Sequence, residues 1–151
     1  MRQSDFPPPA PLTDRALAVI VDAIIVAVPI IIATIYRPES LLGLRSELVI
    51  TAFVVSYFTL LEWAWGRTPG KAFFDLQVVT LTGEDISFVQ SLQRNLLRIL
   101  DSTAFYLVGF LVAYYNPKRQ RLGDLWAETI VVSTKTLNLF KRTAQPQSEA
   151  R

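Results

Sequence analysis

The stretch ALAVIVDAIIVAVPIIIATIY, residues 16–36, decides the fold of this chain. It contains one charged side chain, Asp22, in 21 positions. A helix of that length spans about 31 Å, because each residue adds about 1.5 Å, and a bilayer's hydrocarbon core is about 30 Å thick. The stretch therefore predicts a membrane helix, with Thr13 as its N-cap and a kink at Pro29.

The composition agrees with a membrane location. Hydrophobic residues make up 51% of the 151 residues and charged ones 19%, whereas soluble domains carry about 25% charge. Cysteine and histidine are absent, which excludes disulfides, thiolate nucleophiles, Cys or His metal sites and a Ser-His triad. We therefore expect no enzyme, cofactor or metal site. The net charge of only +2 indicates no nucleic-acid partner.

Two further apolar stretches extend the membrane prediction. Residues 48–65, LVITAFVVSYFTLLEWAW, carry Glu62 near the end, beside two tryptophans typical of a membrane interface. A short loop joins this pass to the first, so the two predict an antiparallel helical hairpin. Residues 95–115 form a third pass if the helix begins near Arg94, because the strongly apolar part is only 14 residues long.

The segments around these passes predict smaller elements. Residues 71–88 indicate a short β-hairpin at the membrane surface, and residues 89–100 an amphipathic helix. The β-branched ETIVVST, residues 128–134, predicts a strand that can pair with LQVVT, residues 76–80.

The fold class that we predict is all-α and integral to the membrane, a bundle of about three transmembrane helices with a minor surface β-hairpin or sheet. One domain covers residues 15–134. A disordered Pro-rich arm precedes it over residues 1–14, and a polar mobile tail follows over residues 135–151.

An internal echo links the first and third passes. Arg15 and Asp22 are seven residues apart, and Arg94 and Asp101 repeat that spacing. Each run also ends in Tyr-x-Pro, at residues 36–38 and 115–117. The echo is either a structural repeat of a kind common in membrane proteins or a coincidence.

The acidic residues inside these passes have two interpretations. An ionised carboxylate in the membrane costs about 2.5–3.5 kcal/mol, so Asp22 has to be protonated, paired or hydrated. It can form a cation or proton site with Asp101 and Glu62, or it can fix helix packing. The ion pairs that the pattern suggests are Asp22 with Arg94 or Arg98, and Asp101 with Arg15.

The other charged residues have simpler interpretations. Glu62 lies where an interface residue is expected, and Arg98 is one turn from Asp101. Arg67 and Lys71 suit lipid headgroups or the cytoplasmic face, since the segment lacks the spacing of a phosphate loop. Asp124 can cap a turn or pair with Arg119 or Arg121.

Several short motifs in order resemble the RDD family of small membrane proteins. Arg15 and Asp22 match the family arginine and first aspartate, and GRTPGKAFFDLQVV is similar to its G-x-T-x-G-K segment and strand. RNLLRILD is similar to its arginine-rich helix start, and RQRLGDLWAETIVV to its closing segment with Asp124. Gly123 stands where many relatives have histidine. The resemblance implies a role in transport, with sodium–proton antiport attributed to some members.

Two functions follow as expectations. The first is a transporter or transporter component that handles a monovalent cation or proton through Asp22, as a homo-oligomer or with other membrane subunits. The alternative is a non-transporting accessory or assembly subunit of a membrane complex. Basic residues in segment 66–98 place it, and the amino arm, on the cytoplasmic side of a plasma membrane. Three passes would then place the basic residues 118–142 outside, a conflict that the sequence leaves open.

Overall fold

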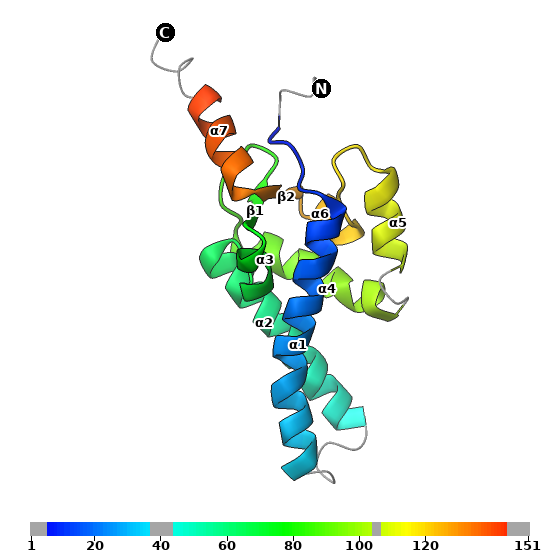
Figure 1. Cartoon of the computed structure of the whole chain (residues 1–151). Helices are drawn as coiled ribbons and strands as arrows, with labels where there is room; N and C mark the ends of the chain where they lie inside the picture. Colours follow the sequence, from blue (N-terminus) through cyan, green and yellow to red (C-terminus); the bar gives the residue numbers. More distant parts are fainter. Residues whose placement is uncertain (1–5, 37–43, 104–106, 145–151) are drawn as a thin grey trace.

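The computed structural model describes residues 6–36, 44–103 and 107–144. In chain order these residues form α1 (Leu12–Tyr36), α2 (Leu44–Trp65), α3 (Pro69–Phe73), β1 (Leu76–Thr80), α4 (Phe88–Thr103), α5 (Leu107–Tyr115), α6 (Leu122–Trp126), β2 (Thr129–Ser133) and α7 (Thr134–Ala144). The antiparallel α1 and α2 form a helical hairpin, and the remaining elements form a head at one end of it (Figure 1).

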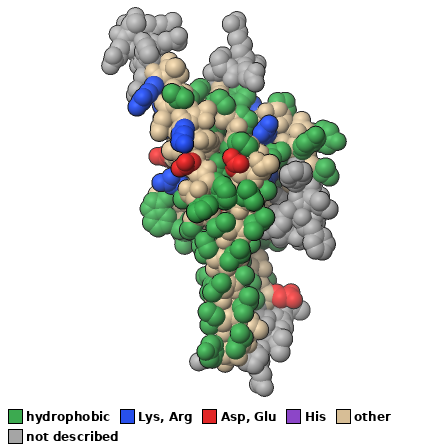
Figure 2. Space-filling view, in the orientation of Figure 1, with side chains coloured by type: hydrophobic (Ala, Val, Ile, Leu, Met, Phe, Trp, Pro, Cys, Tyr) green, Lys and Arg blue, Asp and Glu red, His purple; other side chains and the backbone are tan. Residues whose placement is uncertain are grey.

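The helical hairpin contains the two helices that are long and apolar enough to cross a membrane among the described residues, Leu12–Tyr36 and Glu47–Trp65. Most of their side chains are exposed, and Figure 2 shows the end away from the head as a nearly continuous hydrophobic surface. Both helices begin four residues earlier than predicted, so Thr13 lies in the first turn of α1 and is not its N-cap. The side chains that α1 buries share one face: Arg15, Ala18, Asp22 and Val26.

A two-stranded antiparallel sheet forms the core of the head. β1 pairs with β2 from Leu76↔Ser133 to Thr80↔Thr129. Both strands are almost wholly buried, because their apolar side chains pack against the arm, α1 and α7. Of the predicted β-hairpin only one bridge is present, Val79↔Asp85. The sheet that the sequence suggested between the two distant strands is therefore the main one, and it holds them on the same side of the helical hairpin.

The Pro-rich arm is ordered where the structure describes it. Pro9 bridges Val132, and the Ala10 backbone N–H donates to the Val131 carbonyl at 2.9 Å. Prolines suit this position because they offer no backbone donor along the open edge of a sheet. The prediction of disorder was wrong for residues 6–11.

The third pass is not confirmed. Residues 95–115 belong to two helices, α4 with 16 residues and α5 with nine, and residues 104–106 lie outside the described part. In α4 the polar Ser91, Arg94 and Asn95 are buried, whereas Phe88, Val89, Leu96 and Ile99 are exposed. Whether the echo with α1 is a structural repeat depends on a stretch that includes residues 104–106, so it stays a prediction.

The carboxyl-terminal segment also differs from the prediction. A polar mobile tail was predicted from residue 135, but residues 134–144 form α7, and Leu137 anchors this helix on the sheet with 2% exposure. Residues 145–151 lie outside the described part. Because α7 follows β2 directly, it lies on the same side of the helical hairpin as the start of α1 (Figure 1).

Candidate functional site

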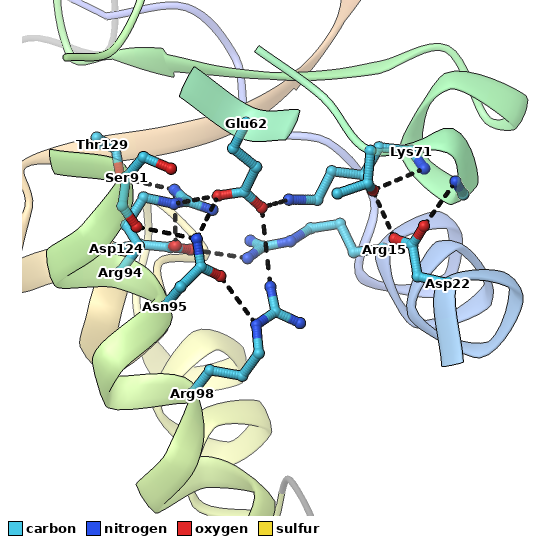
Figure 3. Close-up of polar contacts among 12 residues, drawn as sticks. Arg15, Asp22, Glu62, Lys71, Ser91, Arg94, Asn95, Arg98, Asp124 and Thr129 are labelled. Atoms are coloured by element: carbon cyan, nitrogen blue, oxygen red, sulfur yellow. Dashed lines mark hydrogen bonds and ion pairs between the residues drawn. The ribbon is translucent and has the colours of Figure 1, made fainter. Parts of the chain in front are cut away.

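A buried network of charged side chains lies where the helical hairpin meets the head (Figure 3). α1, α2, α3, α4 and α6 each contribute to it. Its members are Arg15, Asp22, Glu62, Lys71, Arg94, Asn95, Arg98 and Asp124. α2 packs on α4, α1 on α3 and α4 on α6, so these contacts bring together residues that are far apart in the chain.

Glu62 is the centre of the network and is fully buried. Its Oε1 accepts from Lys71 Nζ and lies 3.7 Å from Arg98 Nη2. Its Oε2 accepts from Arg94 Nε at 3.1 Å and from Asn95 Nδ2 at 3.2 Å. Glu62 is therefore buried within the protein, because α4 covers this face of α2 with polar groups, and its level in the membrane stays a prediction.

Asp124 joins the network from α6. Its Oδ2 accepts from Arg15 Nη2 at 2.8 Å, and its Oδ1 lies 2.9 Å from Arg94 Nη1. It also accepts from the Arg121 backbone N–H at 3.1 Å, so the predicted turn-capping role is confirmed. Burial raises the pKa of the Asp124 carboxyl, but Arg94 and Arg15 outweigh burial and lower that pKa to about 2.

Gly123 lets α6 approach α4 closely. A Cβ at this position would lie 2.6 Å from the Arg94 carbonyl oxygen, so a larger residue would push the two helices apart. Arg15 completes the junction by donating to the Arg119 carbonyl as well as to Asp124. One arginine of α1 thereby holds the loop before α6.

Asp22 binds neutral donors in place of the predicted Arg94 or Arg98. Its Oδ1 accepts from the Gly70 backbone N–H at 2.8 Å, and its Oδ2 from Thr68 Oγ1 at 2.5 Å. Tyr57 adds a longer contact of 3.5 Å. Thr68 is also the N-cap of α3, with Pro69 in the first turn, a combination typical of helix starts. The Asp22 carboxylate therefore fixes α3 against α1.

Lys71 points inward from α3. It is 6% exposed and contacts Glu62, so the prediction that it binds lipid headgroups was wrong. Burial lowers the pKa of the Lys71 amine to about 8, although Glu62 opposes that shift. Arg67 is exposed, and its role toward headgroups stays a prediction.

The sequence predicted no site role for several residues that complete the network, although Thr68 belongs to the G-x-T-x-G-K motif. Thr68 Oγ1 binds Asp22, Asn95 binds Glu62, and Thr129 Oγ1 accepts from Arg94 at 2.7 Å. The Thr68-Pro69 helix-start pattern could have identified the first of these. The others carry no local signal. Asp101 lies in α4, but its side chain is outside the described part, so its predicted ion or proton role and its pairing with Arg15 stay untested.

A small cavity of about 30 Å³ lies against the network. Its walls are Arg15, Val19, Asp22, Lys71, Arg94, Arg98, Arg121, Gly123, Asp124 and Val131. Within the described part of the chain, no group of three or more acidic, His or Cys side chains could hold a metal ion.

The low pKa of Asp124 predicts acid sensitivity. A carboxyl whose pKa is about 2 in the folded protein and 3.8 ordinarily contributes about 2 kcal/mol to stability above pH 4. That contribution is lost as the pH falls through 2. We expect Asp124→Asn to be less stable than the wild type at pH 7, and the difference to shrink below pH 4. Thermal unfolding in detergent across this pH range measures it, and a pH-independent difference would contradict the role of the charge.

The fold and the network define a membrane protein with an apolar helical hairpin and a small head that meets it at a charged junction. A family model described as the RDD family matches residues 9–128 of the chain. The chain therefore belongs to the RDD family, as its motifs predicted. No curated protein and no solved structure matches it.

Proposed function

We propose that this chain is a non-transporting, non-enzymatic membrane subunit that holds its head at the membrane surface within a larger assembly. The observation that supports this proposal is that the chain's own groups bind Asp22, Glu62 and Asp124. Transport through Asp22 would need this carboxylate to exchange its partners for a cation or proton. These carboxylates act as buried packing contacts that fix the helices and the head.

Uncovered apolar surface supports the assembly part of the proposal. The outer face of α4 exposes Phe88, Val89, Leu96 and Ile99, with Val89 60% exposed. A groove of about 240 Å³ separates α1 from α2 and is lined by Pro29, Ile30, Ala33, Val49, Ile50 and Phe53. In a membrane such surfaces are covered by lipid or by other helices, either those of a second copy or those of a different subunit.

Two assays on one preparation test the function. We expect the purified chain in vesicles to give no proton-coupled sodium flux above empty vesicles, and we expect Asp22→Asn to give the same result. Asp14→Asn, on the same helix but outside the network, is the matched control. Purification in mild detergent should retain a stoichiometric partner or a defined homo-oligomer. Flux that disappears in a folded Asp22→Asn protein would overturn the proposal.

Proton-coupled transport is the second candidate, and Lys71 favours it. This amine has a pKa of about 8 and contacts Glu62 beside the cavity, so it can exchange a proton near physiological pH. In this second candidate, the group that takes up and releases the proton is the Lys71 amine and not the Asp22 carboxylate. It predicts a flux with a pH optimum near 8 that Lys71→Met abolishes and Arg67→Met leaves unchanged.

The placement of the head supports a cytoplasmic orientation for both basic segments. β1, β2 and α7 lie on one side of the helical hairpin, and ten of the 15 basic residues fall within residues 66–144. The positive-inside rule then favours a cytoplasmic head in the plasma membrane. A cysteine introduced at Thr136 should resist an impermeant thiol reagent in intact cells, because it would lie on the cytoplasmic side. The label is specific to this position, because the chain has no other cysteine. Labelling from outside would reverse the assignment.

A further inference from the structure

The helix α4 carries its side chains in the reverse of the arrangement expected for a helix on a water-exposed surface. Its polar Ser91, Arg94 and Asn95 are buried, whereas its apolar Val89 and Leu96 are exposed. Val89 and Leu96 are seven residues apart, so they lie on the same face of the helix. A helix at a water-exposed surface buries its apolar face and exposes its polar face. The outward face of α4 therefore suits an apolar environment.

α4 is held beside a helix that is long enough to cross a membrane. It lies across the helical hairpin next to α2 (Figure 1). Ser91 Oγ donates to the Thr59 carbonyl at 2.8 Å, and Thr59 lies about 9 Å along the helix from Trp65 at the end of α2. The apolar part of α2 has 19 residues and is about as long as the hydrocarbon core is thick. A bilayer that α2 spans therefore reaches the level of α4.

The outward face of α4 continues the apolar surface of the helical hairpin. Phe88, the first residue of α4, packs edge-to-face on Trp63 of α2, with 5.5 Å between the ring centroids. Both side chains remain exposed on their other sides, as does Trp65. Tryptophan is enriched where the hydrocarbon core of a membrane meets the headgroups. The rings therefore mark the level at which α4 begins, and they connect its apolar face to that of α2.

We propose that α4 lies in the membrane interface, with Phe88, Val89 and Leu96 against the acyl chains of the leaflet nearest the head. The lipid bilayer is then the partner of this face. α4 has 16 residues and α5 nine, so each is shorter than the hydrocarbon core. α5 contains no charged residue and exposes Leu111 and Tyr115, so it suits the same environment. Interfacial helices bury their apolar face by about 5–10 Å.

Lipid on the outward face also accounts for the direction of the polar groups of α4. Arg94 and Asn95 find their partner Glu62 inside the protein, where polar side chains of a helix in contact with lipid have to be satisfied. The inference rests on the membrane location in the proposed function, and it holds whether or not the chain transports ions. It assigns the face of α4 to lipid and leaves the groove between α1 and α2 for other helices.

A fluorescent label on each of two α4 residues tests this inference in lipid vesicles. Val89→Cys and Leu96→Cys each introduce one cysteine into the full chain, which has none, and both positions are exposed, so the label needs no space inside the protein. We expect both labels to lose fluorescence to lipids brominated near the headgroup end of the acyl chains. Lipids brominated near the chain ends should quench them less, because the helix lies in the interface. Iodide in the water should have little effect.

Two matched controls have nearly the same exposure as Val89. The exposed fractions of Ile24, Val89 and Leu139 are 60%, 60% and 62%. Ile24 lies near the middle of the apolar run of α1, so a label on Ile24→Cys should be quenched by lipids brominated near the chain ends. Leu139 lies on α7, which points away from the helical hairpin (Figure 1). A label on Leu139→Cys should be quenched by iodide and not by lipid.

The outcomes separate this inference from the membrane location itself. Labels on α4 that iodide quenches and lipid does not, with Ile24→Cys quenched by lipid, would overturn the inference and leave the membrane location intact. Labels on α4 that neither reagent quenches would also overturn it, and would indicate that another protein chain covers this face. Absence of lipid quenching at Ile24 as well would overturn the membrane location and the inference together.

Discussion

Glu62→Gln is expected to lower the free energy of unfolding by about 3–5 kcal/mol, because it leaves three cations without their common carboxylate in a buried position. Glutamine keeps the size of the side chain and one acceptor oxygen. The loss of stability therefore measures the removal of the charge and not the creation of a cavity. Unfolding in detergent, followed by the fluorescence of the three tryptophans, measures the change.

A matched control and a compensating variant make this test specific. Glu47→Gln makes the same change at an exposed position near the other end of α2 and should alter stability by less than about 0.5 kcal/mol. Adding Lys71→Gln to Glu62→Gln should restore part of the loss, since it removes one cation that had lost its partner. Equal effects at positions 62 and 47 would show that Glu62 is not the centre of the network.

Gly70→Ala is the second substitution with a large expected effect. A Cβ at this position would lie 2.3 Å from the Ala18 carbonyl oxygen and 2.7 Å from Asp22 Cγ. The α1 backbone cannot move away alone, so α3 has to shift and the Gly70 N–H loses its bond to Asp22. Overpacking costs about 1–3 kcal/mol and a lost buried hydrogen bond about the same again, giving about 2–6 kcal/mol in total.

The control for Gly70→Ala stays within the same short helix. Ala72→Ser also adds one heavy atom, but at an exposed position, and it should leave the unfolding temperature unchanged. Because α3 also positions Lys71, Gly70→Ala should reduce the coupling between Glu62 and Lys71 in a double-mutant cycle. Full stability in Gly70→Ala would contradict the close contact between α1 and α3.

The two predictions together describe how the charged junction is built. Gly70 and Asp22 set the position of α3, and that position brings Lys71 to Glu62. Gly123 similarly lets α6 approach α4, so that Asp124 reaches Arg94. In both cases a glycine allows two helices to approach closely, and a carboxylate then binds a group on the other helix. The ion pairs therefore depend on backbone packing and cannot be judged from the charges alone.

The sequence alone determined the features that arise from local pattern. The apolar run around Asp22 identified the first membrane helix, because only a helix of that length satisfies its backbone within a hydrocarbon layer. The helical spacing of Arg15 and Asp22 placed both on one face, and the structure confirms that this face is buried. The ordered motifs identified the RDD family. The helix and its buried face need information from neighbouring residues only, and the family needs the order of the motifs along the chain.

Only the tertiary structure decided which charged groups meet. Arg15 binds Asp124, which is 109 residues away, and Arg94 binds Glu62, 32 residues away. The sequence had paired Asp22 with Arg94 or Arg98, because equal spacing along helices was the available guide. The actual partners depend on β1 pairing with β2 and on α4 turning its polar face toward α2. The sequence suggested the strand pairing, but the packing of α4 on α2 joins distant segments and no local pattern encodes it. Asp22 thus keeps the buried position that the sequence predicted, while its partners are a glycine N–H and a threonine hydroxyl.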